Sequence, residues 1–300
     1  METTLAHQSQ DPRLWALDGL VLARLGQSQK ALSSYKHALE IAPAYLPALE
    51  GAAEIAYKTS NPEAETYLRE ILQVHPDDQT AHGMLAALSF EHGKCQNAVN
   101  EFAQAHDAIA SNPPALKQYG YCLLQLKRAA DAIPVFQRIR QLNPSDVKAT
   151  YRLAVVQSIA GQPHSVVKTL QPEIEKNPSD AAALALLADA YESLSDTPRA
   201  VAALRQAIVL RPDVSDYYLD FANICLVHDS FQVGVDMLNA GLRSTPNSAP
   251  LYMARGILFI QQGKYPDAQA DFAKAERLDP EVRFGSPVQG LLELQQNNLA

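Results

Sequence analysis

The apolar residues of this chain recur with the period of an α-helix. Between residues 180 and 212, two apolar runs are separated by a polar break at residues 195–198. The apolar positions of the two runs are Leu184, Leu187, Ala188 and Tyr191, and then Ala200, Leu204 and Ala207. Spacings of three and four fit one face of a helix with 3.6 residues per turn and do not fit the two-residue period of a strand. The pattern therefore predicts two consecutive helices in this segment.

The same two-helix pattern recurs along the whole chain at a nearly constant interval. Prolines follow the second run of each copy at Pro43, Pro76, Pro144, Pro178, Pro212, Pro246 and Pro280. Their successive gaps are 33, 68, 34, 34, 34 and 34 residues, and Ala110 occupies the place that the double gap skips. We define eight repeats at residues 12–45, 46–78, 79–112, 113–146, 147–180, 181–214, 215–248 and 249–282.

Small residues mark the predicted contact between the two helices of each repeat. Position 8 of the repeats holds Gly19, Ala53, Ala86, Gly120, Ala154, Ala188, Ala222 and Gly256. Position 24, or its equivalent in the shorter second repeat, holds Tyr35, Leu68, Phe102, Phe136, Leu170, Leu204, Leu238 and Phe272. Close helix approach requires small side chains facing larger ones. Glycines at the turns, Gly26, Gly93, Gly161 and Gly263, predict left-handed helix C-caps.

A period of 34 residues with two helices per unit resembles the tetratricopeptide repeat (TPR) from one end of the chain to the other. The first-helix signature of the family is partly kept, since Trp15 and Gly19 match it while Asp18 replaces the usual Leu. The resemblance implies an all-α, right-handed superhelical solenoid: a single array over residues 1–300 with about eight helix-turn-helix units. Its first helices are expected to line a concave face. We interpret the chain as a fragment of a longer array.

Three places depart from the regular pattern. Pro134 is compatible with a second helix that starts late, capped by Asp131, with the proline in its first turn. Pro172 lies deep in a predicted helix, so we expect a bend or short break near residues 170–173. Residues 283–300 are expected to form a capping helix or a truncated ninth repeat.

Composition and charge exclude several functional classes. A formal charge of −8 argues against a general nucleic-acid binder. We find no signal peptide and no apolar run long enough for a membrane span, so we predict a cytoplasmic location. Cys95, Cys122 and Cys225 are odd in number and far apart, and we interpret them as small core residues without a disulfide framework.

No catalytic or cofactor motif is present in the sequence. GxSxG, Walker, HExxH and GxGxxG patterns are all missing, and the histidines lack the spacing of metal ligands. We therefore predict a non-enzymatic protein without a metal or other cofactor.

By family resemblance, the side chains at positions 2, 5, 9, 12 and 13 of each first helix face the concave groove. The candidate peptide-binding residues, all in the second to fifth repeats, are Tyr57, Phe90, Lys117, Tyr121, Leu124, Lys148, Tyr151 and Arg152. Two readings of the four aromatic rings stay open: packing against neighbouring helices, or an aromatic-lined peptide groove. Residues 115–152 carry seven basic and two acidic side chains, so their net charge of +5 favours a partner with an acidic segment.

Two specific TPR ligand motifs are only partly matched. Lys148 and Arg152 agree with the last two residues of the clamp that binds chaperone tails, but Gly83, Ala87 and Gln118 stand where the other three belong. Only Asn223 matches the asparagine ladder of the sugar-transferase TPR superhelix.

The sequence therefore favours a scaffold that binds a peptide or partner segment in its groove. The alternative is a substrate-recognition module of a larger enzyme, such as a glycosyl- or sulfotransferase, with catalysis outside this chain. We expect a monomer or weak end-to-end self-association.

Overall fold

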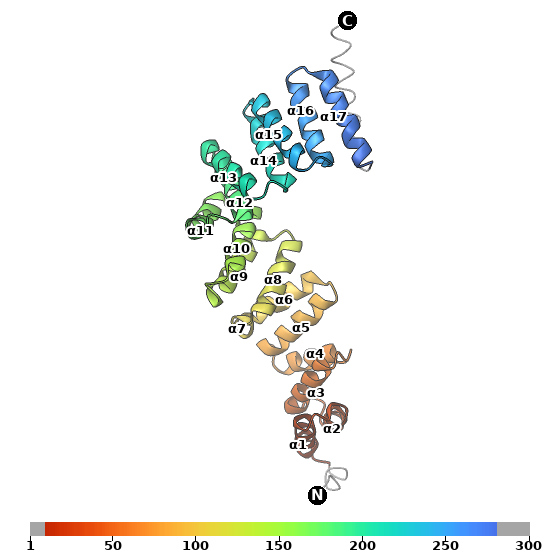
Figure 1. Cartoon of the computed structure of the whole chain (residues 1–300). Helices are drawn as coiled ribbons and strands as arrows, with labels where there is room; N and C mark the ends of the chain where they lie inside the picture. Colours follow the sequence, from red (N-terminus) through yellow and green to blue (C-terminus); the bar gives the residue numbers. More distant parts are fainter. Residues whose placement is uncertain (1–9, 281–300) are drawn as a thin grey trace. The chain divides into compact units, whose positions relative to one another are not determined.

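The computed structural model describes residues 10–280, and that part of the chain consists of helices joined by short turns, with no strand (Figure 1). The predicted all-α repeat fold is confirmed. Packing of the Cα atoms divides the chain into two compact units, residues 1–149 and 150–300, and each is described by itself. The predicted capping helix or ninth repeat at 283–300 lies outside the described residues.

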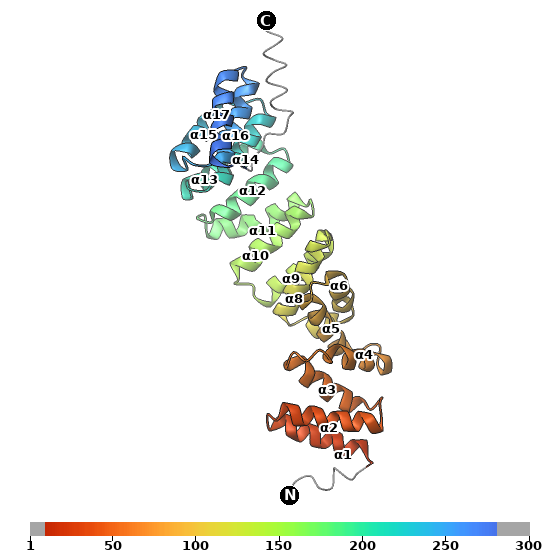
Figure 2. The ribbon, with the colours of Figure 1, turned by 90° about the vertical axis from the view of Figure 1, so that its right-hand side faces the viewer.

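The first unit contains four helix pairs, and the second helix of the third pair is divided in two. Its helices are α1 (Pro12–Arg24), α2 (Ser28–Ile41), α3 (Leu46–Lys58), α4 (Ala64–Val74), α5 (Gln79–Glu91), α6 (Cys95–Gln104), α7 (His106–Ile109), α8 (Pro113–Gln125) and α9 (Ala129–Leu142). Each of α1, α3, α5 and α8 packs against the helix that follows it, and α3, α5 and α8 also contact the pair before (Figure 2). Each repeat therefore contacts mainly its neighbours in sequence, as expected of a solenoid.

Helix α10 crosses the boundary, and the second unit continues the same alternation. Its helices are α10 (Val147–Ile159), α11 (Pro163–Lys176), α12 (Ala181–Ser193), α13 (Thr197–Leu210), α14 (Ser215–Val227), α15 (Phe231–Ser244), α16 (Ala249–Gln261) and α17 (Tyr265–Leu278). Helix α12 packs on both α11 and α13, and α16 packs on both α15 and α17.

Short polar side chains fix where several first helices begin. The Asp78 carboxylate accepts the Ala81 N–H at 2.9 Å, and the Asp180 carboxylate accepts the Ala183 N–H at 3.0 Å. These bonds satisfy backbone donors that have no partner within the first turn of a helix. Because Asp, Asn or Ser precedes many of the apolar runs, the starts of the helices follow from local sequence.

The turn between the two helices of every repeat has a left-handed residue at position 15. The four predicted glycine C-caps are confirmed, with φ between 67° and 75°. The other four repeats place a non-glycine residue there, at φ between 52° and 60°: Ser60, Lys127, Ser195 and Asp229. A side chain in this region costs roughly 1–2 kcal/mol relative to a right-handed conformation. At half of the turns, the packing of the repeat therefore imposes a left-handed backbone conformation on a residue that does not favour it.

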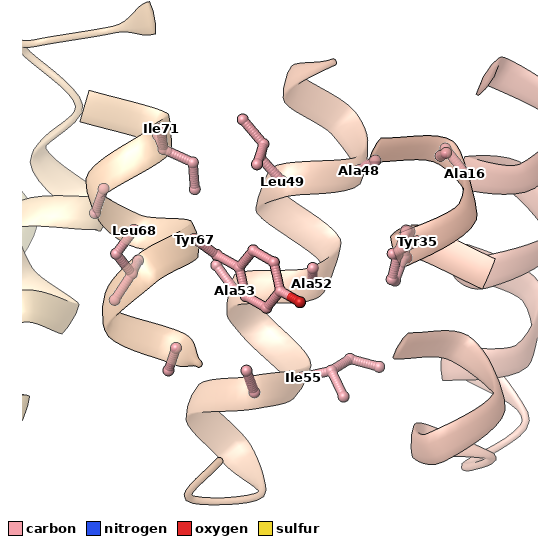
Figure 3. Packing of buried hydrophobic residues seen from close by; sticks show 14 of the residues in the cluster. Ala16, Tyr35, Ala48, Leu49, Ala52, Ala53, Ile55, Tyr67, Leu68 and Ile71 are labelled. Carbon is pink, nitrogen blue, oxygen red and sulfur yellow. The ribbon is translucent and has the colours of Figure 1, made fainter. Parts of the chain in front are cut away.

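The predicted small-to-large contact within repeats is confirmed where position 8 is glycine. A Cβ atom built on Gly19 would lie 2.7 Å from the Tyr35 ring, and one on Gly120 would lie 2.6 Å from Phe136. In the second repeat, Tyr67 and Leu68 of α4 belong to the same buried cluster as Ala52 and Ala53 of α3 (Figure 3). Within each unit the buried hydrophobic residues thus come from adjacent helices: one cluster spans α1 to α5 in the first unit, and two clusters lie in the second.

Both interior prolines are accommodated differently from the prediction. Helix α9 starts at Ala129, so Asp131 lies in its first turn and does not cap it; Pro134 lies inside the helix. Asp131 is held there by an ion pair with Arg128 at 2.7 Å. Helix α11 continues through Pro172 to Lys176, so the short break expected near residues 170–173 is absent, whereas the bend expected as its alternative stays a prediction. Only the last turn follows this proline, and Ile174 packs against the core of the second unit, which holds that turn in place.

The second helix of the third repeat is interrupted, and a side chain of α5 accepts backbone N–H groups just after the interruption. The Gln79 amide oxygen accepts the N–H groups of Asp107 at 2.8 Å and Ala108 at 3.1 Å. It thereby caps α7, which begins at His106 after α6 ends at Gln104. This repeat is the one that lacks the proline of the 34-residue series.

The prediction that the cysteines form no disulfide is wrong. Cys95, at the start of α6, is bonded to Cys122 in α8, and their Cα atoms are 4.9 Å apart. Helices α6 and α8 pack together, so position 17 of the third repeat faces position 10 of the fourth. Cys225 is buried and free, as predicted. The disulfide removes one argument for a cytoplasmic location, since such bonds persist mainly in oxidising compartments.

Candidate functional site

The eight predicted groove residues lie on four first helices. Their places are Tyr57 on α3, Phe90 on α5, Lys117, Tyr121 and Leu124 on α8, and Lys148, Tyr151 and Arg152 on α10. Tyr151 and Arg152 belong to the second compact unit and the other six belong to the first. The contacts between α5 and α8 lie within the first unit.

Two of the aromatic residues meet in the first unit. The rings of Phe90 and Tyr121 lie edge to face, with centroids 5.9 Å apart and planes at 85°. Phe90 is half-buried, whereas Tyr121 exposes 56% of its surface. Tyr121 is the one aromatic residue among the exposed large hydrophobic residues of the described chain. Edge-to-face pairs are a favoured arrangement of aromatic rings and contribute about 0.5–1.5 kcal/mol beyond the buried area. The pair is a preformed apolar platform with one open side.

The neighbouring residues of α8 extend this platform. Lys117 precedes Tyr121 by four residues and is exposed, and Leu124 follows it by three and is half-buried. Residues at these spacings lie on one face of a helix. We call Phe90, Lys117, Tyr121 and Leu124 the α5–α8 platform. It combines apolar contact area with one cation.

Tyr57 and Tyr151 are built into the cores more than the platform is. Both are half-buried, and Tyr57 packs against the first core cluster while Tyr151 packs against that of the second unit. Burial raises the pKa of both phenols, and the nearby carboxylates of Glu91 and Asp180, respectively, raise it further. Each therefore offers only part of its ring to a ligand.

Part of the basic cluster at residues 115–152 is already used within the fold. Arg128 forms an ion pair with Asp131, and Arg138 donates its Nε–H to the carbonyl oxygen of Ala110 at 2.7 Å. Lys117 and Lys148 remain exposed. The charge available to an acidic partner is therefore smaller than the count along the sequence suggests.

A histidine in the first unit forms a bridge that the sequence did not predict. His82 Nδ1 lies 2.6 Å from a carboxylate oxygen of Glu101, and its Nε2 lies 2.9 Å from the carbonyl oxygen of Pro76. Both neighbours are acceptors, so both contacts are hydrogen bonds only when the ring is protonated. Burial lowers the pKa of His82, but the hydrogen bonds to Glu101 and Pro76 outweigh this effect and raise it overall.

A small polar pocket of about 190 Å³ lies between α4, α5 and α6. It is lined by Arg69, Leu85, Ser89, Asn97, Asn100 and Glu101. Arg69 is held by Glu65 on its own helix at 2.7 Å. The pocket uses second helices as well as a first helix and does not coincide with the α5–α8 platform.

The second unit has a different electrostatic character. On its first helices, burial and then the carboxylates of Asp189 and Asp216 raise the pKa of Asp220. Near its end, Arg255 donates two bonds to Asp271, at 2.6 and 2.7 Å, and the Asp271 side chain is only 7% exposed. Carboxylates therefore gather on α12 and α14, while Arg255 on α16 is already paired within the fold.

The described residues, 10–280, lack two further kinds of feature. No three His, Cys, Asp or Glu side chains of this range are grouped so that they could hold a metal ion. None of its helices has the length and apolar character needed to cross a membrane.

Models of the same repeat type match most of the chain. The model described as "Cytochrome c-type biogenesis protein H TPR domain" matches residues 1–116, and the model "Tetratricopeptide repeat" matches residues 106–147, 160–215 and 253–300. The mouse (Mus musculus) "Tetratricopeptide repeat protein 16" is 30% identical over 135 residues, which cover 41% of this chain and 18% of that protein. The bovine (Bos taurus) "BBSome complex member BBS4" is 24% identical over 205 residues, covering 68% and 40%, respectively.

This chain thus spans less than half the length of either relative. Among solved structures, a tetratricopeptide repeat protein from Parabacteroides merdae is 21% identical over 96% of this chain and all of that one, with a TM-score of 0.44. The APC/C hetero-tetramer Cut9–Hcn1 has a TM-score of 0.48 at 14% identity, covering 93% of this chain and 55% of that one. From its helix pairs, its 34-residue period and these family matches, the chain belongs to the tetratricopeptide-repeat family.

Proposed function

We propose that this chain is a non-enzymatic scaffold that binds an extended peptide or partner segment on its first helices, with the α5–α8 platform as the central contact. The observation that carries the proposal is the Phe90–Tyr121 pair, because it holds an aromatic ring that is 56% exposed. Exposed, rigid aromatic residues are frequent anchors of peptide and protein interfaces.

The exposed lysines of α8 and α10 favour a partner that carries acidic groups. Lys117 lies one turn from Tyr121 on the exposed side of α8, and Lys148 is exposed on α10. Tyr151 and Arg152, which belong to the second unit, are separate candidates for peptide binding on that unit. Exposed cations of this kind mainly increase the rate of association and select against wrong partners, while the aromatic residues supply most of the affinity.

The experiment uses a defined ligand. A displayed library of random peptides is selected on the wild-type protein, and the best peptide is synthesised with a fluorophore for anisotropy measurements. The double variant Tyr121→Ala/Lys148→Glu should bind it at least about tenfold more weakly, the loss expected for removal of an aromatic anchor.

The matched control removes an apolar side chain and reverses a charge on second helices. Val74 is 41% exposed at the end of α4 and Lys30 is exposed on α2, so Val74→Ala/Lys30→Glu should leave the affinity unchanged. Equal affinities of the wild type and the Tyr121→Ala/Lys148→Glu variant would refute the placement of the site.

A second candidate function has one observation in its favour. The human "Protein O-mannosyl-transferase TMTC1" is 21% identical over 180 residues, covering 59% of this chain and 20% of that protein. In this alternative the chain selects substrates for a catalytic domain outside residues 1–300. Determination of the complete reading frame distinguishes the two, since only the alternative requires a fused transferase domain.

A further inference from the structure

The disulfide and the ring pair of the α5–α8 platform cross the same boundary between repeats. Cys122 directly follows Tyr121 on α8, and Cys95 comes five residues after Phe90. The turn between Phe90 and Cys95 is tight, since the Gly93 N–H donates to the Phe90 carbonyl oxygen at 2.9 Å. Each ring of the pair is therefore attached by a short stretch of backbone to one end of the disulfide.

A side chain at the edge of the platform also contacts the bond. Gln125 follows Tyr121 by four residues and so lies on the same face of α8. Its Oε1 is 3.0 Å from Cys95 Sγ. In the disulfide this sulfur has no proton to donate, whereas a free Cys95 thiol would donate one to Gln125. The reduced form thus has a hydrogen-bond acceptor already in place.

The boundary between the third and fourth repeats has a short second helix on one side. Helix α6 has 10 residues, whereas α2, α9, α11, α13, α15 and α17 each have 14. Helix α6 packs on α8, and so does the four-residue α7 that follows the interruption. Less continuous helix surface is available to hold α8, so the covalent bond is a larger part of the connection at this boundary.

A boundary of this kind can open without unfolding of the whole chain. Because each repeat contacts mainly its neighbours, the stability of a solenoid is approximately a sum of terms from single repeats and single boundaries. Local opening then costs only the contacts of one boundary, and a covalent bond across that boundary opposes it. The rings of Phe90 and Tyr121 lie on its two sides and would separate when it opens.

We infer that the Cys95–Cys122 bond is a redox-sensitive clamp of the peptide-binding platform. In the oxidised chain the bond keeps Phe90 and Tyr121 together in the binding arrangement. In the reduced chain the third and fourth repeats can separate, and the affinity for the peptide falls. This inference rests on the proposed function of the α5–α8 platform and adds its regulation.

The reaction needs a dithiol as the reductant. Cys95 is the first residue of α6 and follows an exposed turn, whereas Cys122 is fully buried, so Cys95 Sγ is the sulfur that an attacking thiolate reaches first. The S–S bond breaks, and Cys122 leaves as a thiolate and takes up a proton. The second thiol of the reductant then displaces Cys95 from the mixed disulfide and closes the disulfide of the reductant. The reductant loses two electrons and two protons, and the two cysteines gain them.

The test compares the oxidised and the reduced full chain. A fluorescent peptide without cysteine, selected from the library on the oxidised chain, is measured by anisotropy with and without dithiothreitol, at a temperature where circular dichroism shows both forms folded. The reduced chain should bind at least about fivefold more weakly, which corresponds to a platform assembled in a fifth or less of the reduced molecules. Cys95→Ala/Cys122→Ala should bind like the reduced chain in both conditions.

Two variants and one measurement without peptide serve as controls. Cys225→Ala should keep the full response to the reductant, because this cysteine is outside the bond. Asp271→Ala removes a buried ion pair in the second unit and should bind like the wild type, which separates opening at this boundary from a general loss of stability. Hydrogen exchange followed by mass spectrometry should become faster in α8 after reduction and stay unchanged in α12.

Three results would overturn the inference and leave the proposed function in place, provided that Tyr121→Ala/Lys148→Glu still weakens binding. They are equal affinities of the oxidised and reduced chains, a loss of affinity in Asp271→Ala as large as that caused by reduction, and unchanged exchange in α8. If Tyr121→Ala/Lys148→Glu instead binds like the wild type in the oxidised state, the proposed function fails, and the clamp of that site fails with it.

Discussion

The disulfide between α6 and α8 gives the most quantitative prediction. Cys95 and Cys122 are 27 residues apart in sequence and both are buried, at 6% and 0% exposure. A cross-link that closes a loop of this length restricts the unfolded chain and should stabilise the fold by about 3.5 kcal/mol at 25 °C. The variant Cys95→Ala/Cys122→Ala removes the bond without placing a polar group in the core. Alanine is already present at the position equivalent to Cys122 in the sixth repeat, as Ala190.

The assay is urea unfolding followed by circular dichroism, with and without a phosphine reductant. The wild type should lose about 3.5 kcal/mol when reduced, and the double alanine variant should be destabilised by about the same amount and be insensitive to the reductant. Cys225→Ala is the matched control, because this cysteine is buried and unpaired, and the variant should keep the full response to reduction. Three free thiols in the oxidised wild type, or equal stability with and without reductant, would refute the reasoning.

Three further predictions concern the turns and the buried charges. Lys127→Gly and Ser195→Gly should each stabilise the chain by about 1 kcal/mol in urea unfolding, because both positions have positive φ; no gain in either would contradict the assigned turn. Asp271→Ala should cost about 3–5 kcal/mol, because it leaves the Arg255 guanidinium buried without its carboxylate, and a loss below 1 kcal/mol by thermal unfolding would contradict that pairing. The folded-state pKa of His82 is raised, so its contribution to stability should be complete below about pH 6.5 and be lost as pH rises through the higher folded value. His82→Gln should remove this pH dependence, and a variant with the wild-type profile would contradict the assignment.

The repeat architecture could be predicted from the sequence because its determinants are local and recur every 34 residues. Gly26 predicts a left-handed turn by itself, and Gly19 together with Tyr35 predicts a close contact between two helices. Lys127 does not by itself indicate a left-handed turn, because it is not a glycine. Its positive φ can be expected only from its place in the repeat, which aligns it with the glycines of other turns.

The features that were missed depend on contacts between repeats. Cys95 and Cys122 lack a local motif, and their proximity becomes evident only when position 17 of one repeat is placed against position 10 of the next. At the break between α6 and α7, the cap of α7 comes from the Gln79 side chain, 28 residues away from Asp107. In the candidate site, the sequence identified the aromatic residues but could not separate the exposed Tyr121 from the half-buried Tyr57, since burial depends on the adjacent helices.

The central claim is that the first helices around Phe90 and Tyr121 form the binding surface, and amide chemical-shift mapping tests it most directly. The library-selected peptide is titrated into ¹⁵N-labelled full chain. The account predicts that the largest shifts fall on α5 and α8, centred on residues 90 and 117–124, and that Tyr121→Ala reduces them at equal peptide concentration. Largest shifts on the second helices α4, α6 or α9, with α5 and α8 unaffected, would contradict it.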